Sequence, residues 1–328
     1  SPEDGARVTK GWFKVVAPAN DNDNTFIDYK DEIEFAEKDA DSETERWYYA
    51  DGDGKLYEGK IESIKGKYYG FWPEGSGKDA AMLNGLCVLE MESDTNKIKQ
   101  VIADDIDSND LDDILDGKFK NDDWDQKEGD NSGIYLYYFG NDLDGDGSMK
   151  TGNVTINLDG NTYNFLFKKT GNPAGGRGRG VTGIEDKKYI YNYGCKIKAS
   201  SDDKYKLVEV TGTSVDINSD GVVVTKKDTP SWSNDKSYKN SDDEVVRFTY
   251  FDTDERNYYL VNTSGNIQKN KLSGLKDGND CYYYVNNQMN VVLYTDNKTL
   301  KSKDGKPVDK NDGKTFIEKY LNGSVDNN

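Results

Sequence analysis

Apolar and polar residues alternate along the chain in short runs that are separated by turn residues, a pattern typical of β-strands. Many of these runs begin with aromatic doublets or triplets such as Trp47-Tyr48-Tyr49 and Tyr282-Tyr283-Tyr284. A turn of Asp, Asn or Gly follows, then an aliphatic residue or Met and another glycine. A unit of roughly 20 to 25 residues holds one β-hairpin and its connector. Such a unit cannot bury its own apolar face, so it must stack on its neighbours.

This pattern predicts a mainly β chain of tandem antiparallel β-hairpin repeats, solenoid-like, with one or two short helical insertions. Residues 1–90 form an N-terminal β region with hairpins of this kind. Residues 91–132 are an acidic, partly helical connector, and central hairpin repeats occupy 133–228. A polar loop, further hairpin repeats and a short terminal helix occupy 229–328.

Two stretches depart from the strand pattern and predict helix. Apolar residues at helical spacing predict helix, in one or two short stretches, within about 95–120, with Asp110 as the N-cap of the later stretch and Gly117 at its end. The residues at this spacing are Ile98, Val101, Ile102, Ile106, Leu111, Ile114, Leu115 and Phe119. The same spacing near the C-terminus predicts a second helix over 313–322.

Charge and composition narrow the classes of partner. The chain has 61 acidic and 43 basic residues, a net charge of −18, which disfavours nucleic acid and anionic membrane surfaces. Most of this acidity is interpreted as a solubility feature. No apolar stretch approaches the ~18 residues that span a bilayer, so no membrane insertion is expected. The N-terminus looks mature or trimmed. Cys87, Cys195 and Cys281 are expected to be free and buried.

Motifs for metal and phosphate are weak. The carboxylates Asp142, Asp144 and Asp146 match the start of a calcium loop, but the twelfth position lacks the glutamate of an EF-hand. An ordinary polar hairpin turn is the favoured interpretation and calcium the alternative, and no other cofactor is expected. The segment 176–180, Gly-Arg-Gly-Arg-Gly, lacks the ending of a phosphate-binding loop and is interpreted as a flexible, exposed connector.

Catalysis is not expected. The chain contains no histidine, which removes the commonest general base and the Ser-His and Cys-His nucleophile systems. A carboxylate pair could still act on glycosidic bonds, but no pair stands out among 61 acidic residues. The sequence therefore favours a binding protein over an enzyme.

Residues 137–139, Tyr-Tyr-Phe, together with 146–152, Asp-Gly-Ser-Met-Lys-Thr-Gly, resemble the cell-wall-binding repeats. This family includes the choline-binding and glucan-binding repeats of Gram-positive bacteria. Residues 181–191 look like the join between two such repeats, and the resemblance covers 46–86, 135–198 and 256–295. It implies a secreted or surface-attached protein whose hairpins stack into a solenoid, with ligands between aromatic side chains of successive hairpins.

The chain departs from the choline-binding branch at two positions. The tryptophan that follows Thr-Gly in the family is replaced by Asn153 and by Ile184. One aromatic wall of the usual cage is therefore missing at each place, which favours a glycan or protein partner over choline.

The sequence thus predicts a non-catalytic extracellular or cell-surface protein of the cell wall. Its expected partner is a cell-wall polysaccharide, a teichoic acid or a host glycan. The alternative is a structural or adhesion protein that binds a protein partner. Most tyrosines of the doublets should face the core, because alternate residues of a strand point inward. The candidate ligand-binding aromatics are Trp47, Tyr49, Tyr69, Trp72, Tyr138 and Tyr283.

Overall fold

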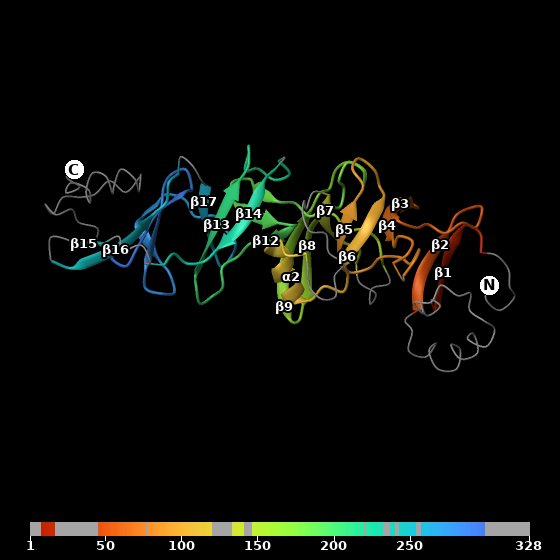
Figure 1. Cartoon of the computed structure of the whole chain (residues 1–328), viewed down its shortest axis with the longest axis horizontal. Coiled ribbons are helices and arrows are strands. Elements are labelled where there is room, and N and C mark those ends of the chain that lie inside the picture. Colours follow the sequence, from red (N-terminus) through yellow and green to blue (C-terminus); the bar gives the residue numbers. More distant parts are fainter. Residues whose placement is uncertain are drawn as a thin grey trace. The chain divides into compact units, whose positions relative to one another are not determined.

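The computed structural model describes residues 8–16, 45–76, 78–119, 133–140, 146–219, 221–231, 237–239, 243–253 and 257–298. These residues form antiparallel β-sheets with one short helix, so the predicted mainly β class is confirmed (Figure 1). The chain divides into two compact units, 1–180 and 181–328. This boundary lies inside the segment 133–228 that the sequence treats as one region. The stacking of the hairpins into a solenoid stays a prediction.

The first unit is a series of small antiparallel sheets. Strand β1 pairs with β2, β3 with β4 and β8 with β9, and β5 lies between β6 and β7. The strands are β1 (Gly11–Val16), β2 (Glu45–Ala50), β3 (Lys60–Ile64), β4 (Lys67–Phe71), β5 (Leu86–Met91), β6 (Ile98–Ala103), β7 (Ile134–Tyr138), β8 (Gly152–Leu158) and β9 (Asn161–Phe167). Their inward residues form a core that is rich in aromatic and aliphatic side chains, with Tyr137, Phe139 and Leu89 fully buried.

The second unit is built in the same way. Strands β10, β11 and β12 follow one another as hairpins, β13 lies between β14 and β17, and a larger sheet has the order β15-β16-β20-β19-β18. The strands are β10 (Gly183–Glu185), β11 (Tyr189–Asn192), β12 (Cys195–Lys196), β13 (Tyr205–Thr211), β14 (Val223–Lys227), β15 (Ser237–Lys239), β16 (Val245–Tyr250), β17 (Asn257–Asn262), β18 (Lys271–Lys276), β19 (Tyr282–Val285) and β20 (Val291–Thr295).

One five-residue turn recurs at the ends of these strands, at 51–55, 262–266, 277–281 and 286–290. Each copy begins with Asp or Asn, whose side-chain oxygen accepts the N–H groups of the third and fifth residues at 2.8–3.0 Å. The N–H of the first residue donates to the carbonyl of the fifth at 2.8–3.1 Å. One short side chain therefore satisfies backbone groups that would otherwise lack partners, as Asp and Asn do in Asx turns.

The fourth residue of this turn has a left-handed backbone. Gly54 and Gly265 have φ values of 74° and 79° there, but Asp280 and Met289 adopt φ 62° and 74° in the other two copies. Glycine accepts this conformation without steric strain, which explains its place in the sequence repeat.

The sequence repeat corresponds to a set of backbone hydrogen bonds that recurs at matching positions. Six residues after the start of the turn, Tyr57 donates its N–H to Tyr49 at 3.0 Å, and Gln268 donates to Leu260 at 2.8 Å. Two residues further on, the backbone is again left-handed in both copies, at 59 and at 270. Residues 49–59 and 260–270 are therefore two copies of one local structure.

Helix α2 (Ser108–Leu115) is the one helix among the described residues. Asp107 is its N-cap, since the Asp107 carboxylate accepts the N–H groups of Asn109 and Asp110. Asp110 accepts the N–H of Asp107 in return, at 3.1 Å. The prediction of Asp110 as N-cap is wrong because both partners of this capping box are aspartates. Gly117 follows the helix with φ 74°, as predicted.

The predicted helical span of about 95–120 is too long, because residues 98–103 form strand β6. The register between β5 and β6 shifts between Val88 and Leu89 and again between Glu90 and Met91. Ile98 and Ile102 are buried and lie four residues apart, a spacing that places two residues on one face in a strand as well as in a helix, so the pattern alone does not separate the two. The second predicted helix, 313–322, lies outside the described residues. No helix in the described part of the chain is long and apolar enough to span a membrane.

All three cysteines are free, but they are not equally buried. Cys87 and Cys195 are buried as predicted, whereas Cys281 is only partly buried. The prediction of burial is wrong for Cys281 because this residue directly follows the exposed tip of the 277–281 turn. Burial raises the pKa of the Cys87 thiol and of the Cys281 thiol.

The repeated turn predicts a matched pair of stability effects within one loop. We expect Asn286→Ala to lower the free energy of unfolding by about 1–2 kcal/mol, because it leaves two backbone N–H groups without an acceptor. Asn287→Ala is the control, since the Asn287 side chain is exposed and bonds to no other described residue. Urea unfolding of both variants measures the difference. Equal stability of the two variants would contradict a structural role for the side-chain oxygen.

The exposure of the three thiols predicts their reactivity. At neutral pH a thiol reagent should label one cysteine rapidly in the native protein and all three after unfolding, because only the thiolate of an accessible cysteine reacts. Cys281→Ser should abolish the rapid reaction. In the parent protein the labelling rate of Cys281 should keep rising with pH above the ordinary pKa of a thiol, since the raised pKa shifts thiolate formation to higher pH. Rapid labelling of Cys87 would show that the core opens.

Candidate functional site

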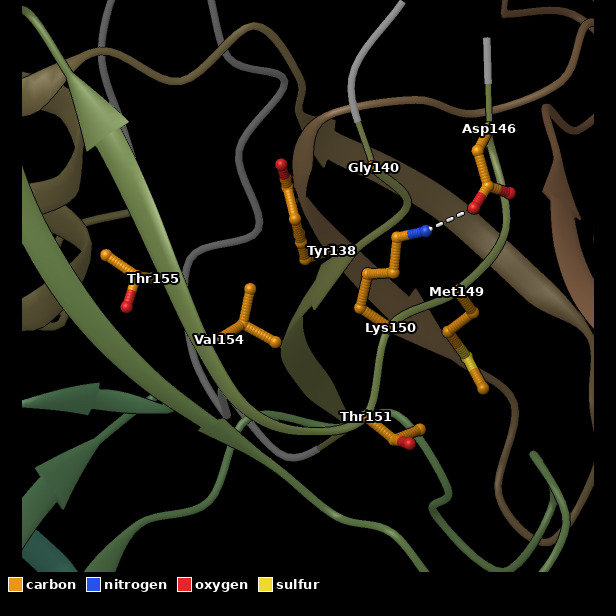
Figure 2. A pocket seen from close by; sticks show the side chains of 8 residues that line it. All are labelled: Tyr138, Gly140, Asp146, Met149, Lys150, Thr151, Val154 and Thr155. Carbon is orange, nitrogen blue, oxygen red and sulfur yellow. Dashed lines mark hydrogen bonds and ion pairs between the residues drawn. The ribbon is translucent and has the colours of Figure 1, made fainter. Parts of the chain in front are cut away.

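A cavity of about 520 Å³ lies at the end of β7, in the first unit (Figure 2). Tyr138 ends β7, and Val154 and Thr155 belong to β8. The intervening segment is held against β7 by the N–H of Lys150, which donates to the carbonyl of Tyr138 at 2.7 Å. The lining residues are Tyr138, Gly140, Asp146, Met149, Lys150, Thr151, Val154 and Thr155.

Gly140 is needed for this segment to pass close to β7. Its φ is 76°, and a Cβ built on it would collide with the backbone carbonyl of Asp146. A larger residue would therefore be strained in conformation and would also displace Asp146. The glycine that follows the aromatic triplet in the sequence thus serves a close approach of two backbone segments.

The polar side of the cavity is an ion pair. The ammonium of Lys150 points toward Asp146 and lies 2.7 Å from its Oδ2, and it also donates to Ser148 Oγ at 3.2 Å (Figure 2). Lys67 lies 3.6 Å from the other carboxylate oxygen. The hydrogen bonds from Lys150 and Ser148 hold the pKa of Asp146 well below its usual range, although desolvation opposes them. Asp146 therefore remains an acceptor at neutral pH.

The cavity combines apolar and polar walls in the way that sugar sites do. Tyr138, half-buried, and Val154 offer apolar surface, while Thr151, Asp146 and Lys150 offer hydroxyl, carboxylate and ammonium groups. A pyranose has apolar C–H faces and a rim of hydroxyl groups, so an apolar wall beside a few donors and acceptors suits it. Asp146 is the one carboxylate among the lining residues.

One of the three predicted calcium ligands belongs to the described residues. Asp142 and Asp144 lie outside the described residues, and Asp146 is the remaining member of the set. Its carboxylate already contacts the ammonium groups of Lys150 and Lys67. No group of three or more His, Cys, Asp or Glu side chains that could hold a metal ion occurs among the described residues.

A second aromatic assembly, the N-terminal aromatic cluster, comprises Trp12, Tyr49, Tyr57, Tyr69 and Phe71. The ring of Trp12 lies 5.1 Å from that of Tyr49 and 4.8 Å from that of Tyr69, both edge to face. Tyr49 is only 9% exposed, while Trp12, Tyr57 and Tyr69 are half-buried at the rim. The sequence identified Tyr49 and Tyr69 but missed Trp12 and Tyr57. The signal in the sequence is the largely apolar run Gly-Trp-Phe-Lys-Val-Val at residues 11–16, which forms β1 and sets Trp12 opposite Tyr49 by antiparallel pairing.

The remaining candidate aromatics differ in exposure. Trp47 is 39% exposed and open to a ligand, whereas Trp72 is 9% exposed, with the Lys78 ammonium 4.7 Å from its ring centroid. Tyr283 is 2% exposed and packs on Tyr294 with 4.4 Å between ring centroids. Tyr283 is therefore a core residue, and its ring offers no surface to a ligand. The same applies largely to Tyr49 and Trp72, because alternate residues of a strand face inward.

Comparisons with known proteins do not assign the chain to a family. No protein-family model and no curated protein matches it. Choline binding protein F from Streptococcus pneumoniae is 16% identical over 75% of this chain and 76% of its own length, with a TM-score of 0.18. The modular autolysin LytC from the same organism is 13% identical over 75% of this chain and 36% of its own, also with a TM-score of 0.18. TM-scores this low do not establish a common fold.

A third similar structure is an alternansucrase in complex with isomaltononaose. It is 15% identical over 75% of this chain and 14% of its own length, with a TM-score of 0.17. The chain thus spans about a third of the autolysin and a smaller part of the alternansucrase. These likenesses leave the role of the cavity to be argued from its own residues.

The ion pair of the cavity predicts a difference in acid stability. The folded-state pKa of Asp146 is lowered, so its stabilising contribution is present above the ordinary aspartate pKa of about 4 and is lost as the pH falls below it. We expect Asp146→Asn to be less stable than the parent protein at pH 6, with this gap narrowing toward pH 2. Thermal unfolding of both proteins between pH 6 and pH 2 measures it. A gap that stays constant over this range would show that the charge of Asp146 contributes nothing.

Proposed function

We propose that this chain is a non-catalytic, extracellular or cell-surface protein that binds a saccharide polymer in the cavity beside Tyr138. The observation that carries the proposal is the lining of this cavity, where a half-buried tyrosine ring lies beside carboxylate, ammonium and hydroxyl groups. The sugar ring would stack on Tyr138, and its hydroxyl groups would bond to Asp146, Lys150 and Thr151. The sequence resemblance of residues 135–198 to cell-wall-binding repeats supports a location at the cell wall.

The functional groups that line the cavity support the proposal of binding without catalysis. Hydrolysis of a glycosidic bond uses two carboxylates on opposite sides of that bond. The cavity lining contains Asp146 alone, and hydrogen bonds hold its pKa low, which suits an acceptor and not a general acid. The absence of histidine from the chain removes the commonest alternative proton carrier.

Polymer binding would draw on more than one site. A single aromatic contact contributes only about 1 kcal/mol, so a useful affinity for a polymer needs several contacts acting together. The N-terminal aromatic cluster has three half-buried rings at its rim, and Trp47 is exposed. These residues are the additional contacts that the proposal assigns to the polymer.

Replacement of Tyr138 tests the proposal. Tyr138→Ala should weaken binding to an insoluble α-glucan or to purified Gram-positive cell walls by roughly fivefold, the loss of about 1 kcal/mol of stacking. Tyr138→Phe should bind nearly as well as the parent protein, because the ring face is kept. Co-sedimentation with increasing amounts of polymer measures the affinities.

Tyr205→Ala is the matched control, since Tyr205 is also half-buried but belongs to β13, in the second unit. This variant should bind like the parent protein. Circular dichroism would establish that all three variants are folded. Equal binding by Tyr138→Ala and the parent protein would overturn the assignment of the cavity, and competition by choline alone would point to a cationic ligand instead.

A further inference from the structure

The segment of residues 171–180, here called the arginine loop, is not the flexible connector that the sequence predicts. Its backbone is held by bonds from Arg177 N to the Asn172 carbonyl at 3.0 Å, and from Gly178 N to the Lys168 carbonyl at 2.9 Å. Gly176 and Gly178 both have φ 87°. A Cβ on Gly178 would collide with the side chain of Met149. The two glycines therefore fix a tight path that sets the intervening arginine in place.

Both arginines of this loop lie on tyrosine rings of the first unit. The guanidinium carbon of Arg179 lies 4.1 Å from the ring centroid of Tyr135, and Arg179 Nε donates to the hydroxyl of Tyr137 at 3.3 Å. The guanidinium carbon of Arg177 lies 5.7 Å from the ring centroid of Tyr68. Stacking of this kind restricts a guanidinium to one plane and leaves its edge directed outward.

Neither guanidinium has a carboxylate partner among the described residues. Arg177 donates through Nη1 to the Gly171 carbonyl at 3.5 Å, and its Nε is buried with no acceptor. The arginine loop contains two of the six arginines of the chain. Arg247, by comparison, pairs with Asp296 at 2.8 Å. A buried N–H donor without an acceptor costs free energy, which a bound acceptor would recover.

Further positive charge surrounds the arginine loop. Lys168 reaches the Gly175 carbonyl at 2.9 Å through its ammonium, and the exposed Lys169 follows it in the chain. The hydroxyl of Tyr137 accepts from Arg179 and is not itself an anion at neutral pH, because burial raises its pKa to about 12. Four cationic side chains are thus gathered within twelve residues of a chain whose net charge is −18.

We propose that the arginine loop binds an oxyanion group, phosphate or carboxylate, that is attached to the saccharide polymer. A guanidinium presents paired N–H donors that match the two oxygens of such a group, and both groups here are held in place by tyrosine rings before any ligand binds. The proposal rests on the proposed saccharide function and specifies the charge of the polymer. Because the guanidinium groups cover one face of Tyr68 and of Tyr135, these faces are not open to a cationic ligand.

Three small probes with the same sugar ring separate the contribution of the anionic group to binding from that of the sugar. Glucose is neutral, glucuronic acid carries a carboxylate and glucose 1-phosphate carries a phosphate. The parent protein should bind at least one of the two anionic probes on the order of tenfold more tightly than glucose, as expected for charge-assisted hydrogen bonds. Titrations followed by NMR at low and high salt would measure the affinities, and salt should weaken only the anionic probes.

Matched variants assign this preference to the arginine loop. The double variant Arg177→Gln, Arg179→Gln should lose the tenfold preference and keep its affinity for glucose. The double variant Lys55→Gln, Lys65→Gln removes the same charge from exposed positions and should keep the preference. Arg177→Lys together with Arg179→Lys keeps the charge but loses the planar donors, so most of the preference should be lost.

The outcomes distinguish this proposal from the saccharide function. Equal affinity of the parent protein for all three probes, or a preference that survives both arginine variants, would overturn the anion site and leave the Tyr138 cavity untouched. Anion binding by glucose 1-phosphate without any binding of walls or glucan would support the anion site and overturn the polymer. If the glutamine variant does not fold, the lysine variant tests the proposal instead. Binding of the anionic probes by the lysine variant with the affinity of the parent protein would mean that only diffuse electrostatic attraction acts, and would overturn the anion site.

Discussion

The side-chain oxygen of Asp or Asn at the start of the five-residue turn is the interaction on which the hairpins depend. In each of the four described copies it accepts two backbone N–H groups and so closes the turn from within. Short strands with shallow cores cannot rely on burial alone, because their apolar area is small. A local hydrogen bond that satisfies the backbone allows the chain to reverse direction at little cost in free energy, and the same turn recurs at four described places.

This constraint explains why tyrosines are among the largest fully buried side chains of the core. A thin sheet needs side chains that fill space yet tolerate partial solvation, and the tyrosine hydroxyl can reach a polar partner while the ring packs. Tyr294 illustrates this, since its ring packs on Tyr283 and its hydroxyl donates to Asp277 Oδ2 at 2.8 Å. Asp277 is also the first residue of a five-residue turn, so one carboxylate joins a core tyrosine to a hairpin end.

The sequence predicts the strands and turns well because both are encoded locally. The alternation of β-branched and polar residues over 151–158 becomes β8, and Asp159 and Gly160, both typical turn residues, form a tight turn with positive φ at both positions. The prediction fails where a distant segment decides. The four-residue spacing of Ile98 and Ile102 fits a helix as well as a strand, and the pairing with β5 decides for the strand. The burial of Tyr283 depends on Tyr294. Site residues are harder still, because Lys150 and Arg179 gain their significance only from the rings and carboxylates that the fold brings beside them.

Some aromatic rings of the chain are already covered in part by its own cations. The Lys60 ammonium lies 4.3 Å from the ring centroid of Tyr57, and that of Lys196 lies 3.7 Å from the centroid of Tyr189. A quaternary ammonium ligand would have to displace these groups, and each such contact is worth about 0.5–1 kcal/mol where it is exposed. A neutral sugar does not have to replace a cation, and an anion gains from the cations. Asn153 and Ile184, which stand where the cell-wall-binding repeats have tryptophan, and the internal cations therefore both support the proposal of a saccharide rather than choline.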